Sequence, residues 1–230
     1  MERLGNKEKR SPRMMTRVAV ALLGLLSMGW SAPMNSCTSL IEPITISKEG
    51  ILGRWLYIGG SSNLPGSRSL GRLLTSVWLE VTAAAESNVL NIIQTQRLYS
   101  KCSSLAYNVT FENSTMKIEK PFYLKEVYLE TNCSSCLAVY EDIVSGNDTF
   151  TSFMLFSRSK TASPDAVEHF KKQAECLRMP APIMMDPNTE ICPSNIPASE
   201  GLSALNSLLE AKTGHRVARV LDALFDAFVN

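Results

Sequence analysis

The residues with the most reactive side chains are six cysteines, and their spacing allows two kinds of chemistry. They are Cys37, Cys102, Cys133, Cys136, Cys176 and Cys192. An even number of cysteines in an exported chain indicates disulfide bonds, although the spacing does not determine their pairing. The Cys133-x-x-Cys136 motif could also be redox-active or bind a metal. Those uses need a helix start beneath the motif or a second ligand pair, and neither is visible, so we expect structural disulfides.

No catalytic constellation accompanies the cysteines. The two histidines, His169 and His215, fall in expected helices among charged neighbours, which is typical of a solvated surface. The sequence contains no Gly-x-Ser-x-Gly motif, no histidine pair with metal-binding spacing and no glycine-rich phosphate loop. We therefore expect a protein that is not an enzyme and that needs neither a cofactor nor a metal.

The amino terminus predicts export. Residues 1–32 combine a basic start, a short apolar segment at 18–28 and small residues at 29–32, as secretory signal peptides do. The alternative, a membrane anchor, would need about 20 apolar residues. Without this segment the chain is slightly acidic and has no basic patch that would bind nucleic acid. We expect a secreted, extracellular protein.

Four glycosylation motifs are consistent with export. The Asn-x-Ser/Thr asparagines are Asn108, Asn113, Asn132 and Asn147. Because glycans must face solvent, we expect these positions in turns or on outward strand faces.

Eight short apolar segments separated by turn residues predict strands. They span residues 55–61, 73–82, 89–99, 104–112, 116–120, 122–130, 136–142 and 149–158. Eight strands with short connections suggest an antiparallel meander that closes into a barrel large enough for a small ligand. A β-sandwich shows the same alternation and is the alternative.

A helix is expected directly after the last strand. Ser163-Pro164-Asp165 supplies an N-cap, a first-turn proline and an acid near the positive helix end. Val167 and Phe170 begin an apolar stripe that would lie along the outside of the sheet. Sandwiches rarely end this way, so the helix favours the barrel.

The carboxyl-terminal tail predicts a second, amphipathic helix. Val217, Val220, Leu221, Leu224, Phe225 and Phe228 form its apolar stripe. This helix could dock on the barrel, pair with another chain or lie on a lipid surface such as a lipoprotein particle. We divide the chain into a signal peptide (1–32), a barrel domain (33–195) and this tail (196–230).

These motifs together resemble the lipocalin family. The resemblance consists of Gly53-x-Trp55 after an amino-terminal cysteine, eight strands, and one helix ending in Cys176-Leu177. The stretches 107–111 and 175–180 are similar to the orosomucoid (alpha-1-acid glycoprotein) branch. The stretches 153–158 and 186–192 also resemble the neighbouring apolipoprotein M branch.

The resemblance implies a fold, a function and two disulfides. The fold is all-β, an eight-stranded antiparallel up-and-down barrel with one packed α-helix and a helical extension, in which Gly53 and Trp55 form the floor. The function is reversible transport of small hydrophobic molecules in plasma, as in an acute-phase carrier. The implied bonds are Cys37–Cys176 and Cys102–Cys192, and we expect Cys133–Cys136 as the third.

The resemblance also suggests residues that line the cavity. They are Tyr57, Tyr107, Phe122, Tyr123, Met154 and Phe156. The alternative is that several of them pack in the core or on the outer face. Many lipocalins cover the floor tryptophan with an arginine. Residues 182–186, where the resemblance places it, contain none, so we expect Trp55 to lack that cover. An enzymatic alternative, as in prostaglandin synthases of this family, would require Cys133 or Cys136 as a free thiol.

Overall fold

The computed structural model describes residues 35–229, so the expected signal peptide lies outside the described residues. Eight antiparallel strands form the body of the fold, close to the expected bounds. They are β1 Gly53–Ser62, β2 Leu74–Ala83, β3 Val89–Leu98, β4 Lys101–Glu112, β5 Thr115–Ile118, β6 Tyr123–Leu129, β7 Cys136–Ser145 and β8 Asp148–Ser157.

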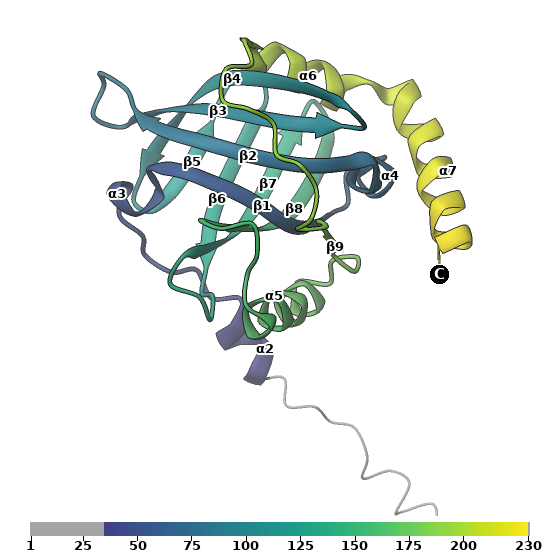
Figure 1. The fold of residues 1–230 in the computed structure, drawn as a ribbon, viewed down its shortest axis with the longest axis horizontal. Coiled ribbons are helices and arrows are strands. Elements are labelled where there is room, and N and C mark those ends of the chain that lie inside the picture. The colour runs from purple at the N-terminus through teal and green to yellow at the C-terminus, as the bar shows by residue number, and fades with distance from the viewer. Residues whose placement is uncertain (1–34, 230) are drawn as a thin grey trace, which may run out of the picture. The chain divides into compact units, whose positions relative to one another are not determined.

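The sheet closes on itself (Figure 1). Each strand pairs with the next along the chain, and the last strand returns to the first, where Leu56 lies opposite Ser157. Full closure removes the free edges that a sandwich would leave. The barrel prediction is therefore confirmed, and the sandwich alternative is wrong.

Strand alternation divides the apolar residues between the barrel interior and its outer wall. On β8, Met154 and Phe156 belong to the interior cluster, whereas Phe153 and Leu155 belong to a second cluster outside the barrel. Both faces of β8 are thus apolar, because one faces the lumen and the other faces a helix.

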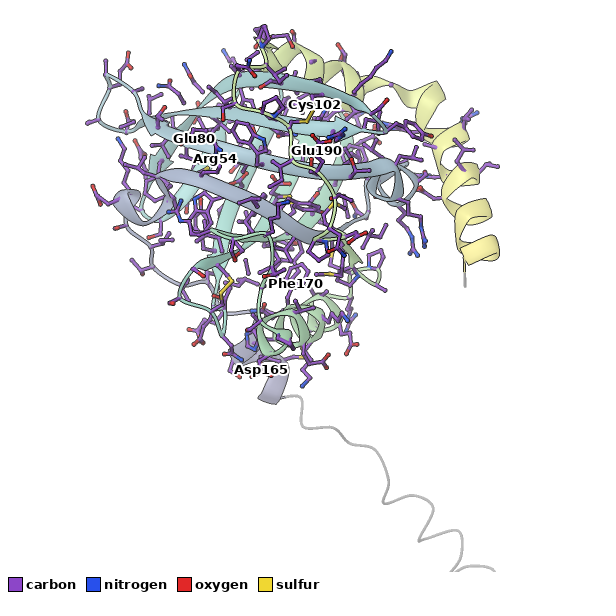
Figure 2. All side chains as sticks on the ribbon, in the orientation of Figure 1. Arg54, Glu80, Cys102, Asp165, Phe170 and Glu190 are labelled. Atoms are coloured by element: carbon purple, nitrogen blue, oxygen red, sulfur yellow. A yellow bond between two sulfur atoms is a disulfide. The ribbon has the colours of Figure 1, made fainter. Side chains whose placement is uncertain are left out.

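That helix is α5, Pro164–Cys176, which begins and docks as its sequence predicts. The Ser163 side chain accepts a hydrogen bond from the Ala166 amide at 3.2 Å. Phe170 lies on the barrel side of the helix (Figure 2), and its ring stacks on Phe153 with 4.5 Å between centroids. The Gln173 amide donates to the carbonyl oxygens of Leu40 and Glu130, linking α5 to two other segments.

The barrel floor contains an arginine that the sequence analysis did not expect. Trp55 is buried beside the short helix α3, Lys48–Ile51, and its indole nitrogen donates to the Ile51 carbonyl at 2.8 Å. The Arg158 guanidinium lies 3.4 Å from the centre of the Trp55 ring and donates to the Leu52 carbonyl at 2.7 Å. A cation over an indole face is favourable. The expectation that Trp55 lacks an arginine cover is therefore wrong.

The covering arginine comes from a different segment from the one in which it was expected, residues 182–186. Residues Ile183–Met184 form the short strand β9, which pairs with Gly59 and Gly60 on β1. The covering arginine instead follows β8 directly. Gly53 leaves room for it, since a Cβ there would lie 3.1 Å from an Arg158 nitrogen and the glycine φ is +90°.

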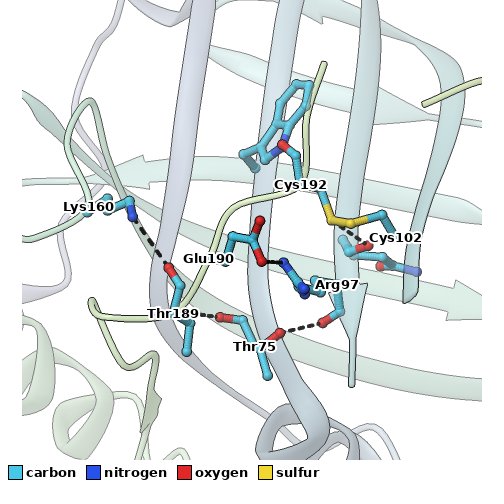
Figure 3. Close-up of polar contacts among 9 residues, drawn as sticks. Thr75, Arg97, Cys102, Lys160, Thr189, Glu190 and Cys192 are labelled. Atoms are coloured by element: carbon cyan, nitrogen blue, oxygen red, sulfur yellow. Dashed lines mark hydrogen bonds and ion pairs between the residues drawn. A yellow bond between two sulfur atoms is a disulfide. The ribbon is translucent and has the colours of Figure 1, made fainter. Parts of the chain in front are cut away.

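The segment 185–197 runs across the outside of β1 to β3 as a strap (Figure 3). The Trp78 indole donates to the Cys192 carbonyl at 3.0 Å, and Arg97 pairs with Glu190 at 2.6 Å. The strap leads to β10, Ala198–Glu200, which pairs in parallel with β4.

Three disulfides join the cysteines in the expected pairs. Cys37–Cys176 ties the helix α2, Asn35–Leu40, to the end of α5, and Cys102–Cys192 ties the strap to β4. Cys133–Cys136 closes the turn before β7. No cysteine of the described chain is free, so the thiol that the enzymatic alternative requires is bonded.

The tail docks on the barrel as two helices instead of one. In α6, Gly201–Glu210, Leu209 is buried against the interior cluster, and Leu202 and Leu205 pack beside it. The next helix, α7, Lys212–Val229, contacts α4, Ser67–Leu73, where the Asp222 carboxylate accepts from the Ser69 amide at 2.8 Å. None of the helices in the described part of the chain has the length and apolar character needed to span a bilayer.

Candidate ligand site in the barrel

The barrel interior is layered along its axis. Trp55, Val81 and Leu90 lie at the closed end, and Ile118, Leu124 and Phe150 lie toward the open end. All six belong to one apolar cluster. Between these layers is a group that we call the polar belt. It consists of Tyr57, Gln94, Tyr107, Glu126, Glu141 and Ser152.

An acid pair is the centre of the polar belt. Glu126 on β6 and Glu141 on β7 are direct cross-strand partners, and Glu141 is in turn opposite Ser152 on β8. Leu124 and Tyr128, two residues either side of Glu126, belong to the interior cluster. Since side chains two apart share a face, Glu126 also points inward. Both glutamates keep some accessible surface, so they are not sealed in the packed core.

The surroundings favour protonation of the pair. Burial raises the pKa of Glu126 well above its usual range, and the charge of Glu141 raises it further. Burial also raises the pKa of Glu141, while hydrogen bonds from Glu126 and Ser152 act in the opposite direction. Two carboxyls in contact cannot both ionise cheaply, and sharing one proton relieves their repulsion. The pair therefore holds a proton more tightly than a solvated glutamate does.

Three tyrosines surround the acid pair. Burial raises the pKa of Tyr57, and the Glu141 charge adds to this effect. The pKa values of Tyr107 and Tyr128 are raised by burial and then by both glutamates. The three phenols therefore stay protonated and can act as hydrogen-bond donors. Tyr107 donates to Gln94 at 3.3 Å, whereas the buried Tyr128 hydroxyl has no hydrogen-bond partner among the described residues.

Glycine makes room for one of these phenols. A Cβ at Gly60 would overlap the Tyr57 hydroxyl oxygen. Tyr57 also contacts Phe156 edge to face, with 5.6 Å between ring centroids. The ring is held by apolar contact while its hydroxyl extends toward the belt, an arrangement suited to an amphipathic aromatic side chain.

Five of the six expected lining residues lie in or against the interior cluster. They are Tyr57, Tyr107, Phe122, Met154 and Phe156. Tyr123 is 40% exposed and lies on the opposite face of β6 from Leu124, so its expected place in the cavity is corrected. Contact of the other five with a ligand stays a prediction.

Neither acid of the pair was among the residues expected to line the cavity. One signal could have found Glu126. It stands between Leu124 and Tyr128 at the inward positions of an alternating strand. His215 was also misjudged. It is partly buried, and its ring lies edge-on to Phe150 with 5.7 Å between centroids.

The four sequon asparagines are all exposed, as glycosylation requires. Asn108 lies on the outward face of β4, and Asn113, Asn132 and Asn147 lie in turns or loops between strands. All four positions could carry a glycan without disturbing the interior.

Comparison with known proteins agrees with this architecture. No protein-family model matches the chain. A protein from Rhinella marina described as "Lipocalin" is 26% identical over 162 residues, which cover 68% of this chain and 87% of the relative. The solved structure described as "The Siderocalin Ex-FABP functions through dual ligand specificities" matches with a TM-score of 0.54 and 16% identity. It covers 64% of this chain and 99% of that chain.

The fold is that of a lipocalin, a closed barrel with one helix packed on its wall. The chain is thus similar to a curated lipocalin in sequence and to a solved siderocalin in fold.

The acid pair predicts that the ligand-free protein loses stability as pH rises. Burial gives both glutamates a folded-state pKa above the ordinary value of 4.5. Above about pH 4.5 the folded chain therefore binds more protons than the unfolded chain. Its free energy of unfolding should fall as pH rises, until the pair is fully ionised. Urea unfolding between about pH 5 and pH 8 measures this slope. Glu126→Gln should flatten it and stabilise the protein by about 1–3 kcal/mol at the upper end.

The matched control for this experiment is Glu119→Gln. Glu119 is exposed, so its substitution should leave the pH slope unchanged. An identical slope in the wild type and in Glu126→Gln would show that the pair does not hold a proton in the folded state.

Proposed function

We propose that this protein is a secreted glycoprotein that carries small, largely hydrophobic molecules inside its barrel. The ligand would be drug-, toxin-, steroid- or lipid-like, as in the orosomucoid branch, and binding would be reversible. The observation that carries the proposal is the layered interior, in which a few polar groups lie between apolar layers. Ligand sites in proteins commonly combine an apolar lining with a small number of orienting polar groups.

Filling the lumen tests this proposal directly. Met154 is partly buried against the interior cluster. Met154→Trp should therefore block the barrel and weaken binding of the neutral fluorescent probe N-phenyl-1-naphthylamine about tenfold or more. The control is Ile93→Trp, because Ile93 is 39% exposed on β3. Equal binding by both variants and the wild type would place the probe outside the barrel and contradict the proposal. If Met154→Trp does weaken binding, native mass spectrometry of protein isolated from its source fluid should identify the natural ligand.

One observation favours a second role, that of an apolipoprotein M-like lipid carrier bound to lipoprotein particles. Val217 and Val220 on α7 are each 59% exposed, and Leu221 is 45% exposed, so this part of the apolar stripe faces away from the barrel. Exposed apolar residues on an amphipathic helix are suited to a lipid surface.

The structure indicates how to test this role without damaging the barrel. Deleting 201–230 would also remove Leu209 from the interior cluster, whereas serine at Val217, Val220 and Leu221 changes only exposed side chains. The triple variant should no longer float with lipoprotein but should still bind N-phenyl-1-naphthylamine. Unchanged flotation would remove the lipid-surface role.

A further inference from the structure

The barrel wall is incomplete between β4 and β5. β4 has 12 residues and β5 only four, and the two strands pair only over Thr110–Glu112 of β4. In the described part of the chain, residues 101–109 of β4 therefore have no partner on β5. Val109 lies opposite Leu90 at the closed end of the barrel, so the unpaired part of β4 extends toward the open end. The short strand β10 pairs with Ser104–Ala106 and leaves the rest of this edge to another element.

The tail helix α6 supplies the missing part of the wall. It lies beside β4 (Figure 1) and also contacts β7, and these two strands flank the short strands β5 and β6. Leu202, Leu205 and Leu209 on its inward face pack against the interior cluster. At its start, a Cβ on Gly201 would lie only 2.9 Å from the Tyr107 ring, so the helix begins in close contact with β4. α6 is therefore part of the enclosure around the ligand site, a role that strands fill in a complete barrel.

The segment that contains α6 is attached to the barrel covalently at one end and by hydrogen bonds at the other. Before α6, the Cys102–Cys192 disulfide and the pairing of β10 with β4 fix the chain. After α6, the Asp222 carboxylate on α7 accepts from the Gly66 and Ser69 amides, both at 2.8 Å, and from the Ser69 hydroxyl. We call these three hydrogen bonds the latch. A disulfide does not open during ligand binding, whereas local hydrogen bonds break and reform with the native fold intact.

The packed position of α6 leaves one polar atom unpaired. Asn206 is on the same helix face as Leu202 and Leu209, because residues three and four apart are neighbours on a helix surface. Its side-chain oxygen is buried without a hydrogen-bond partner among the described residues. An unpaired buried acceptor raises the free energy of the packed state relative to a state in which water reaches it. α6 is therefore easier to displace than a helix with an entirely apolar inner face.

We propose that α6 is a gate in the barrel wall through which the ligand enters and leaves, and that the latch on Asp222 keeps this gate shut. The inference rests on the proposed carrier function and adds the route by which the same site is reached. The gate opens when the latch breaks and α6 moves outward, which uncovers the interior between β4 and β7. It closes again behind the ligand, so Leu202, Leu205 and Leu209 form part of the lining in the complex.

A gate of this kind affects the rates of binding more than the affinity. The latch stabilises the closed form of the free protein and the closed form of the complex equally, so its loss leaves the dissociation constant nearly unchanged. Association and dissociation both pass through the open form, so both rate constants rise with its population. A residue that only stabilises the fold would not raise the two rate constants together.

Asp222→Ala removes the latch and leaves the three leucines of α6 in place. Stopped-flow fluorescence with N-phenyl-1-naphthylamine should show association and dissociation rate constants that are each raised about tenfold, because hydrogen bonds to a charged group are lost. The dissociation constant should stay within about twofold of the wild-type value. Arg219→Ala is the matched control, since Arg219 is exposed on the same helix, and its rate constants should equal those of the wild type.

A disulfide beside the latch tests the opposite change. A Cβ at Gly66 would lie 3.0 Å from the Ala218 Cβ. Disulfides need about 3.5–4.5 Å between these atoms, so Gly66→Cys/Ala218→Cys should form a bond after a small shift. The oxidised variant should bind and release the probe about tenfold or more slowly, because the open form is no longer populated. Gly66→Cys alone is the control for the glycine φ of +87°, and mild reduction should return the double variant to the rates of this control.

The outcomes separate this inference from the carrier function. If the probe binds but Asp222→Ala leaves both rate constants unchanged, the ligand uses another route, and the gate is wrong while the carrier function stands. If Asp222→Ala tightens binding without changing the dissociation rate constant, α6 stays displaced in the complex, which also overturns the gate. If N-phenyl-1-naphthylamine does not bind the wild type, both proposals are wrong. The latch variant decides the question by itself if the engineered disulfide does not form.

Discussion

Replacing Phe170 with alanine is expected to lower the free energy of unfolding by about 3–5 kcal/mol. The ring is 1% exposed and stacks on Phe153, which is itself completely buried. Removing it leaves a cavity between α5 and the barrel wall that neither rigid element can close. Because Phe153 faces outward from β8, the loss should affect stability without changing the barrel interior.

Urea unfolding followed by circular dichroism measures this effect, and a nearby exposed site provides the control. Glu168→Ala removes a 3.9 Å pair with Lys172 on the solvent face of the same helix, where exposed pairs contribute little. Binding of N-phenyl-1-naphthylamine below the unfolding transition should be the same in all three proteins. A loss of less than about 1 kcal/mol for Phe170→Ala would mean that α5 does not depend on this contact.

Removing the disulfide between Cys102 and Cys192 is the second change with a large expected effect. Serine at both positions should cost about 4.5 kcal/mol, because this bond closes a long loop and restricts the unfolded chain. The two cysteines are 90 residues apart, and the bond holds the strap against β4 (Figure 3). The strap also covers Trp78, whose indole donates to the Cys192 carbonyl. Tryptophan fluorescence of the folded variant should therefore shift toward that of an exposed indole.

The bond between Cys133 and Cys136 supplies the matched comparison. These residues are only three apart, so serine at both positions should cost about 1.5 kcal/mol by the same loop argument. Chemical unfolding of both double variants measures the difference, which should be about 3 kcal/mol. Equal losses would show that loop length does not determine the contribution of these bonds.

The sequence by itself determined the strands, the helix α5 and the separation of inner from outer residues. Each of these follows from a local regularity, because alternation over two residues assigns a face and Ser163-Pro164 marks a helix start. Once closure is assumed, alternation also separates Phe153, outside the barrel, from Met154, inside it. The tail was recognised as helical for the same reason, although its break at Ala211 was not.

Tertiary structure decided everything that depends on which strands are neighbours and how they are aligned. Glu126 and Glu141 form a pair only because the register of β6 and β7 places them opposite each other, and a shift of one residue would turn one of them outward. Arg158 covers Trp55 because closure brings the end of β8 beside the start of β1. The spacing of residues within the sequence does not show which of these long-range contacts form. The floor could therefore be anticipated in part from its tryptophan, whereas the acid pair at the centre of the site appeared only when the barrel closed.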